Sequence, residues 1–135
     1  MHDLITAILL HDEEEPVGAL KPVLEEQGLK TCRACTCGQA ARLVAQATAP
    51  CLLFTDVKLP DGSWADVLQV AARARVPANV IVVSRHVDIR FYVDVIERGA
   101  FDFITPPFAG SDLAHVVRCA GDNLLAQKFA QARSA

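Results

Sequence analysis

The chain has 135 residues, the length of one domain, and 52% of them are hydrophobic, which is enough aliphatic material for a single core. Its net charge of −3 disfavours a nucleic-acid-binding surface, and no apolar stretch approaches the ~18 residues of a membrane span. An odd number of cysteines, 5, in a chain that can build a core argues against a disulfide framework and favours a reducing, cytoplasmic setting.

Apolar segments and helical patterns alternate along the chain. The segments predicted as strands are 4–10, 29–34, 51–54, 80–83 and 101–104. Three of them, 4–10, 51–54 and 80–83, are almost continuously apolar. Such runs are typical of strands that are covered on both faces in a parallel sheet.

Residues with helical spacing predict a helix after each strand. Pro16 suits the first turn of the first helix, Ser63 with Asp66 resembles a capping box for the third, and Asp88 and Gly99 bound the fourth. The residues expected to face the core are Val17, Leu20 and Leu24 in the first helix, Ala40, Leu43, Val44 and Ala47 in the second, Val67, Leu68, Ala71 and Ala74 in the third, Ile89, Tyr92, Val93 and Ile96 in the fourth, and Leu113, Val116, Val117, Ala120 and Leu124 in the fifth, which Ser111 opens.

Five β-α units joined by right-handed crossovers predict an α/β fold with an open, doubly wound, five-stranded parallel sheet. The common strand order for five units is 2-1-3-4-5, with the ligand crevice at the carboxyl ends of strands 1 and 3. We expect residues 1–125 to form this domain. Residues 126–135 either extend the last helix or begin a linker to a further domain.

The residues just past the strands carry the predicted chemistry. Asp12 follows the first strand and Asp56 the third, so the two lie one inter-strand spacing of ~4.8 Å apart along the sheet. Carboxylates this close repel each other, and Mg²⁺ relieves the repulsion because it accepts one or two carboxylates with waters and phosphate oxygens. A carboxylate can also attack phosphorus, and Ser84, after the fourth strand, is placed to hydrogen-bond phosphoryl oxygens.

Four segments together resemble the receiver domain of response regulators, the CheY-like superfamily. They are the acidic opening at 9–14, the segment TDVKLPDG at 55–62 with its D-x-x-[LM]-P-x-G core, the strand end VVS at 82–84, and GAFDFITPPF at 99–108, which is similar to G-A-x-x-[FY]-[IL]-x-K-P-F. The resemblance covers about residues 4–125, in the right order and spacing. It implies a flavodoxin-like fold and a signalling module of a bacterial two-component system rather than an enzyme, with self-phosphorylation and autodephosphorylation at most.

The resemblance also implies a role for each matching residue. Asp56 would accept a phosphoryl group from a sensor histidine kinase or a small phosphodonor. Asp12, Asp56 and the carbonyl of Lys58 would bind Mg²⁺, and Ser84 and Phe103 would be the switch residues. The helix predicted at 88–98, the strand at 101–104 and the helix from 111 would pass the signal to an output domain or downstream protein, or form a homodimer.

Two positions depart from the family pattern. Pro106 stands where the family has a lysine, and losing such a charge-stabilising group typically removes ~3–4 kcal/mol of transition-state stabilisation. Arg85 or Lys58 could replace it, or both could face solvent. His11 replaces the first residue of the acidic pair, and it could be a metal ligand that favours Mn²⁺ or another divalent ion, or a polar residue at the rim. The resemblance also implies that Glu13 borders the metal pocket. It makes the Pro106–Pro107 bond a candidate for a cis bond, because the bond at this position of the family is usually cis.

Three alternatives remain open. The missing lysine favours a pseudo-receiver that binds or dimerises without phosphorylation. A small metal-dependent phosphohydrolase or a flavodoxin-like cofactor binder is also possible, although no phosphate-binding glycine loop follows the first strand. Cys32, Cys35 and Cys37 could bind Zn²⁺ with His11 or His2, but Cys32 lies in a predicted strand, where alternate side chains face opposite sides.

Overall fold

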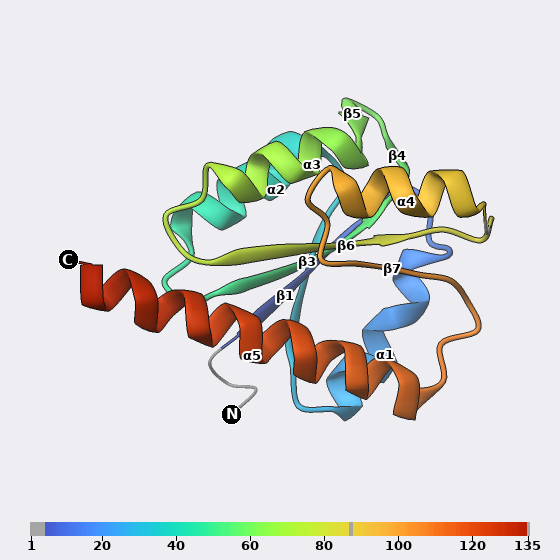
Figure 1. The fold of residues 1–135 in the computed structure, drawn as a ribbon. Helices are drawn as coiled ribbons and strands as arrows, with labels where there is room; N and C mark the ends of the chain where they lie inside the picture. The colour runs from blue at the N-terminus through green and yellow to red at the C-terminus, as the bar shows by residue number, and fades with distance from the viewer. Residues whose placement is uncertain (1–4, 87, 135) are drawn as a thin grey trace.

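Five parallel strands form the central sheet of the computed structural model, which describes residues 5–86 and 88–134, with side chains as far as residue 131. The strands are β1 (Thr6–Leu10), β2 (Lys30–Ala34), β3 (Cys51–Asp56), β6 (Ala78–Val83) and β7 (Asp102–Ile104). They lie in the order β2-β1-β3-β6-β7, which is 2-1-3-4-5 by position along the chain (Figure 1). The predicted α/β fold and strand order are confirmed. Residue 4 of the first predicted strand and His2 lie outside the described residues.

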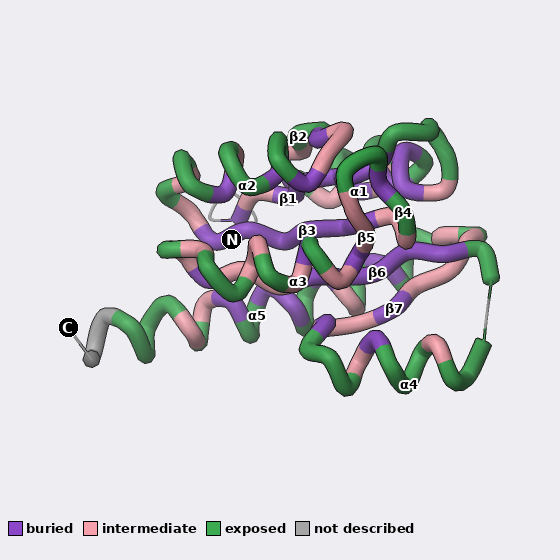
Figure 2. The backbone as a smooth tube through the Cα atoms, turned by 90° about the horizontal axis from the view of Figure 1, so that it is seen from above, coloured by how far each residue is buried: buried purple, intermediate pink, exposed green. Residues whose placement is uncertain are grey.

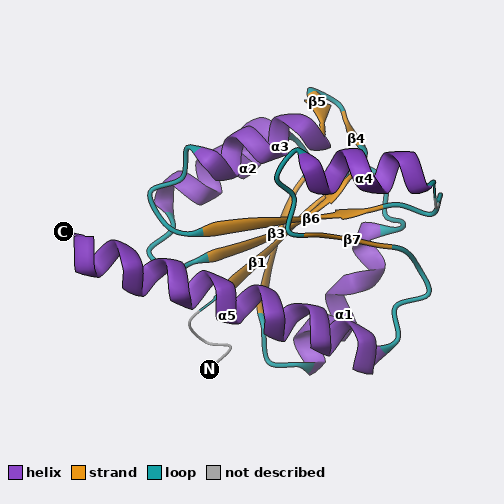
Figure 3. Cartoon of the chain, viewed as in Figure 1, coloured by secondary structure: helices purple, strands orange, loops and turns teal. Residues whose placement is uncertain are grey.

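Helices cover both faces of the sheet (Figures 1 and 3). The 3-10 turn η2 (Val17–Ala19), α1 (Leu20–Glu26) and α5 (Gly110–Ser134) pack on one face. The helices α2 (Cys37–Gln46), α3 (Trp64–Ala72) and α4 (Ile89–Glu97) pack on the other. In the central strand, Cys51 and Leu53 join one core cluster while Leu52 and Phe54 join the other, which explains the continuous apolar run (Figure 2).

Several helix ends have the predicted side-chain caps. Ser63 and Asp66 form the capping box of α3, and the side chain of Asp88 accepts a hydrogen bond from the backbone of Arg90. Gly99 has a φ of 112°, a left-handed conformation that glycine adopts without strain, directly after α4. These short-range signals therefore mark the start of α3 and both ends of α4.

A long-range cap ties the loop after β3 to α2, and the sequence did not predict it. Asp61 Oδ1 accepts a hydrogen bond from the Cys37 N–H at 2.8 Å, and Oδ2 accepts one from the Gly38 N–H at 3.0 Å. These backbone hydrogen bonds lower the pKa of Asp61 because they favour its charged form. The loop that follows Asp56 is thereby held against the amino end of α2.

Three local features differ from the prediction. A hairpin of two short strands, β4 (Lys58–Leu59) and β5 (Gly62–Ser63), follows β3. The first helix begins with η2 instead of a regular α-helical turn at Pro16. The last helix continues through residues 126–134 and projects past the sheet (Figure 1). None of the helices within the described ranges combines the length and apolar character that crossing a bilayer requires.

The expected core face of α4 is wrong. Ile89 is 77% exposed, and Tyr92 and Val93 are more than 40% exposed. The helix instead buries Val95 and packs Phe91 against the core cluster. Apolar residues occupy both sides of this helix, so its spacing alone could not decide which side faces the sheet. The consequence is an exposed apolar face on α4.

Candidate functional site

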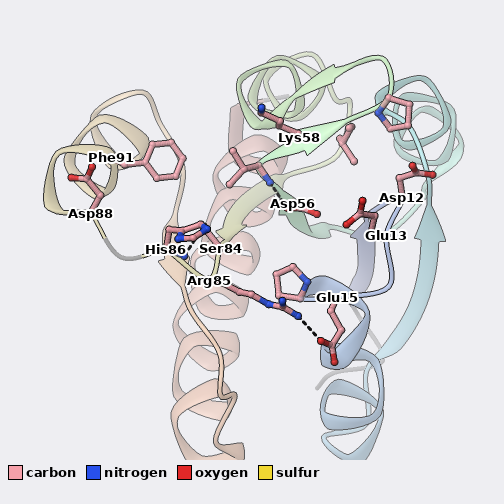
Figure 4. Close-up of a pocket in the computed structure, with 14 residues that line it drawn as sticks. Asp12, Glu13, Glu15, Asp56, Lys58, Ser84, Arg85, His86, Asp88 and Phe91 are labelled. Atoms are coloured by element: carbon pink, nitrogen blue, oxygen red, sulfur yellow. Dashed lines mark hydrogen bonds and ion pairs between the residues drawn. The ribbon is translucent and has the colours of Figure 1, made fainter.

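A pocket of about 860 Å³ lies at the carboxyl ends of β1, β3 and β6 (Figure 4). Parallel strands present their carboxyl ends at one edge of the sheet, so residues from distant parts of the chain meet there. The residues that line the pocket are Asp12, Glu13, Glu15, Pro16, Asp56, Val57, Lys58, Leu59, Pro60, Ser84, Arg85, His86, Asp88 and Phe91. The predicted crevice therefore exists and brings Asp12, Asp56 and Ser84 together.

Asp56 is the last residue of β3 and is half-buried in this pocket. Its Oδ1 accepts a hydrogen bond from the Val57 N–H at 2.7 Å, while Oδ2 has no hydrogen-bond donor among the described residues. Burial raises the pKa of Asp56, and Glu13 adds to this, while the Val57 N–H, His11 and Arg85 oppose it. The carboxylate thus has one oxygen held by the backbone and one directed to the open pocket.

The acidic residues after β1 lie opposite Asp56. Asp12 and Glu13 are exposed and line the pocket, and Figure 4 shows their carboxylates on the side that Asp56 faces. Arg33 donates a hydrogen bond to the backbone carbonyl of Asp12 at 3.0 Å, which holds this loop to β2. Three carboxylates, those of Asp12, Glu13 and Asp56, therefore line one pocket without an ion-pair partner among the described residues, and a divalent cation relieves the repulsion between them.

His11 does not join this group. Its ring is buried at 2% exposure, and Nδ1 donates a hydrogen bond to the carbonyl of Glu13 at 2.9 Å. It lines a separate cavity of about 210 Å³ with Glu14, Gly18 and Lys21. The structure therefore gives His11 a place in this second cavity and not in the lining of the pocket of Asp12 and Asp56, although it is near enough to lower the pKa of Asp56.

Ser84 follows β6, the strand that pairs with β3, and it lines the pocket with 7% exposure. Its backbone N–H donates to the carbonyl of Ile104 at 3.2 Å, which fixes it to β7. Its Oγ accepts a hydrogen bond from the His86 N–H at 3.1 Å. The hydroxyl hydrogen has no acceptor among the described residues, so it is available to a ligand oxygen.

Pro106 lies outside the main pocket. With cis-Pro107 after it, as the resemblance implied, it lines a neighbouring cavity of about 230 Å³. Glu15 and Arg85 line both cavities, and the Arg85 guanidinium forms an ion pair with the Glu15 carboxylate. Lys58 lines the pocket, but Figure 4 shows its ammonium directed away from Asp56.

An aromatic cluster connects the pocket to the helices beside it. Phe103 is 9% exposed and makes edge-to-face contacts with Phe91 and Tyr92, at centroid distances of 5.6 and 5.9 Å. Phe91 makes a second edge-to-face contact with Trp64 at 5.6 Å, and Arg98 lies over the Trp64 ring at 4.9 Å. Phe103 was predicted from the sequence as a switch residue, whereas Phe91 was not predicted, although the i, i+4 pair of Phe91 and Val95 indicates that both face the core.

Three oxygen donors of the pocket suit a hard cation. Asp12 and Asp56 offer carboxylate oxygens and Lys58 a backbone carbonyl, the oxygen-only set that Mg²⁺ takes with water. No three His, Cys, Asp or Glu side chains in the described ranges are grouped to hold a metal by themselves. Cys32 is exposed and Cys37 is buried, and burial raises the pKa of Cys37 to about 11, which opposes the thiolate that Zn²⁺ needs.

Comparison with known proteins gives one consistent family. A family model described as the response regulator receiver domain matches residues 7–118. The photosynthetic apparatus regulatory protein RegA of Cereibacter sphaeroides is 28% identical over 87% of this chain and 64% of its own length. The response regulator protein TmoT of Ectopseudomonas mendocina is 33% identical over 89% of this chain and 54% of its own. The chain thus spans between half and two thirds of these relatives.

Solved structures show the same fold. A response regulator receiver domain protein (CheY-like) from Methanospirillum hungatei superposes with a TM-score of 0.75 at 22% identity, over 92% of this chain and 98% of that chain. The beryllofluoride-activated NtrC4 receiver domain dimer superposes with a TM-score of 0.74 at 24% identity, over 89% of this chain and 98% of that chain. At these identities the likeness concerns the fold alone.

Proposed function

Because the chain belongs to the response regulator receiver domain family of two-component systems, we propose that Asp56 accepts a phosphoryl group from a sensor histidine kinase. The resulting change would pass to an output domain or a downstream protein. The observation that carries this proposal is that Asp56, Asp12 and Ser84 line one pocket at the carboxyl edge of the sheet. The free cysteines of the chain fit a protein of the reducing cytoplasm.

The oxygen donors of the pocket would hold Mg²⁺. Asp12, Asp56 and the Lys58 carbonyl would be the ligands, and the cation would neutralise charge on the phosphoryl oxygens. His11 lies in a separate cavity, so the donors facing Asp56 contain no imidazole from this residue. This oxygen-only set favours Mg²⁺ over the softer ions that a histidine ligand would recruit.

The chain's own groups account for the transfer step. Asp56 Oδ2 attacks the phosphorus of a phosphohistidine, the P–N bond breaks, and the electron pair leaves with the imidazole nitrogen, which takes up a proton. Ser84 donates its free hydroxyl hydrogen to a phosphoryl oxygen. Movement of Ser84 would open space beside Phe103, whose rotation would alter its contacts with Phe91 and Tyr92.

The exposed face of α4 is the surface we propose for signal output. Ile89, Tyr92 and Val93 are exposed apolar side chains, and Tyr92 also contacts Phe103. A change at Phe103 therefore reaches this surface directly. A homodimer through α4, β7 and α5 is one use of it.

A pseudo-receiver is the second candidate, and the observation that favours it is Pro106 in the position of the family's lysine. Incubation with Mg²⁺ and acetyl phosphate, followed by intact-mass measurement, separates the two. We expect one phosphoryl group on the protein and none on Asp56→Asn. A protein that gains no phosphoryl group, and that binds its partner as well after the incubation as before it, would support the pseudo-receiver. Continuous phosphate release without a stable adduct would instead indicate a phosphohydrolase.

A further inference from the structure

We propose that Arg85 takes over the role of the missing lysine, and that Glu15 holds the guanidinium until a phosphoryl group is present. Arg85 would exchange its ion pair with Glu15 for the phosphoryl oxygens on Asp56. This inference rests on the proposed phosphorylation of Asp56. It assigns to this pocket the positive charge of Arg85, just past the end of β6, whereas the family's lysine comes from the end of β7.

The position of Arg85 supports this assignment. It directly follows Ser84, and it lines both the pocket of Asp56 and the neighbouring cavity of Pro106. Its side chain therefore borders both the pocket that holds the reacting carboxylate and the cavity beside Pro106, the position of the family's lysine.

Glu15 is the competitor for this guanidinium. Figure 4 shows Arg85 extending from the end of β6 toward Glu15, below Asp56. The two side chains are 56% and 64% exposed, and ion pairs this exposed contribute little to stability, so the pair separates easily. A phosphoryl group carries more negative charge than a carboxylate and accepts two parallel guanidinium hydrogen bonds, so it attracts Arg85 more strongly once formed.

Lys58 is the other cation of the pocket and fits the role less well. Its backbone is paired in the β4–β5 hairpin, and its ammonium points away from Asp56. The loop that carries it is fixed by the Asp61 hydrogen bonds to the amino end of α2. Arg85 needs only a rotation of its own exposed side chain.

Arg85 forms no covalent bond in this scheme. The P–O bond to Asp56 forms and the donor's bond breaks as in the proposed transfer, and Arg85 contributes charge and hydrogen bonds to the phosphoryl oxygens. It therefore acts on both the transition state and the product. Removing it should slow phosphorylation and weaken binding of a phosphoryl mimic.

The test compares five variants of the full chain with acetyl phosphate and Mg²⁺, with the rate of adduct formation followed by intact mass. Arg85→Gln should react about 100-fold more slowly, the usual loss for one charge-stabilising donor. Glu15→Gln should react about two- to fivefold faster, since it removes a competitor held by a weak, exposed ion pair. The double variant should behave like Arg85→Gln, and Arg85→Lys should recover part of the rate. Arg90→Gln, which removes the same charge from exposed α4, should match the wild type.

A second readout does not depend on phosphoryl transfer. Beryllofluoride binding, followed by Trp64 fluorescence, should weaken in Arg85→Gln and strengthen in Glu15→Gln. Equal rates and equal beryllofluoride affinities in Arg85→Gln and wild type would overturn the assignment of Arg85 while leaving Asp56 phosphorylation intact. A wild-type protein that takes up neither phosphoryl nor beryllofluoride would overturn the proposed function itself.

Discussion

Replacing Asp56 with asparagine should stabilise the folded protein at neutral pH. The change preserves the shape of the side chain and its acceptor for the Val57 N–H, but it removes a negative charge that is half-buried and lies near Glu13. Burial and this neighbour raise the pKa of Asp56 in the fold, so its ionised form lowers the stability of the native state. The carboxylate that we propose as the phosphoryl acceptor thus lowers the stability of the fold.

The size of the effect is modest because solvent reaches part of the group. A gain of the order of 1 kcal/mol is expected for relief of a partly screened carboxylate. With an unfolding entropy of ~2.1 cal/mol/K per residue, a chain of 135 residues gains about 3–4 °C in melting temperature for each kcal/mol. Thermal unfolding by circular dichroism resolves a shift of this size.

The pH dependence gives the prediction its direction. As pH falls through the raised pKa of Asp56, the native state binds its proton before the unfolded state does, so the wild type regains stability. The regained stability is complete below the unfolded pKa of ~3.9. The advantage of Asp56→Asn should therefore be present at pH 7 and vanish below about pH 4. Asp122→Asn, at an exposed position of α5, is the control. A destabilised Asp56→Asn at pH 7, or a difference in stability between variant and wild type that does not change with pH, would contradict the raised pKa of Asp56.

Three further predictions concern stability and the aromatic cluster. Asp61→Asn should lower the melting temperature at neutral pH. The lowered pKa of Asp61 means that its charged form stabilises the fold above pH ~3.9, and this stabilisation is lost as pH falls through the folded pKa. Equal melting temperatures of variant and wild type at pH 7 would contradict this. Phe91→Ala should reduce the free energy of unfolding by about 2–3 kcal/mol, less than a fully buried phenylalanine, and shift Trp64 emission to longer wavelength; unchanged emission would mean that the two rings do not depend on each other. Val95→Ala should lower the free energy of unfolding in urea by about 2 kcal/mol, while Val93→Ala should stay within about 0.5 kcal/mol of the wild type. The reverse order would mean that α4 turns the face predicted from the sequence toward the core.

The convergence of Asp12, Asp56 and Ser84 could be predicted because it follows from topology. Each residue comes just after an apolar strand, and parallel strands end at one edge of the sheet. Local caps such as Ser63 with Asp66 could be read for the same reason, since three residues suffice to show them. The sequence therefore predicted well the features that depend on order along the chain.

Features that depend on contacts between distant residues escaped prediction. Asp61 caps a helix start that lies 24 residues away, and Arg85 pairs with Glu15 across 70 residues. The orientation of His11 depends on the path of the acidic loop, whose Glu13 carbonyl accepts its Nδ1 hydrogen. The face of α4 was ambiguous because its pattern contains two apolar sides, and packing against Phe103 and Trp64 decided between them.

Reductive trapping identifies the phosphorylated residue itself. Borohydride reduces an aspartyl phosphate to homoserine, which marks the modified residue permanently for peptide mass spectrometry. After incubation with Mg²⁺ and a phosphodonor, we expect homoserine at position 56 and at no other aspartate. Homoserine at another aspartate, or its absence from a protein that still takes up beryllofluoride, would contradict the claim that Asp56 is the phosphoryl acceptor.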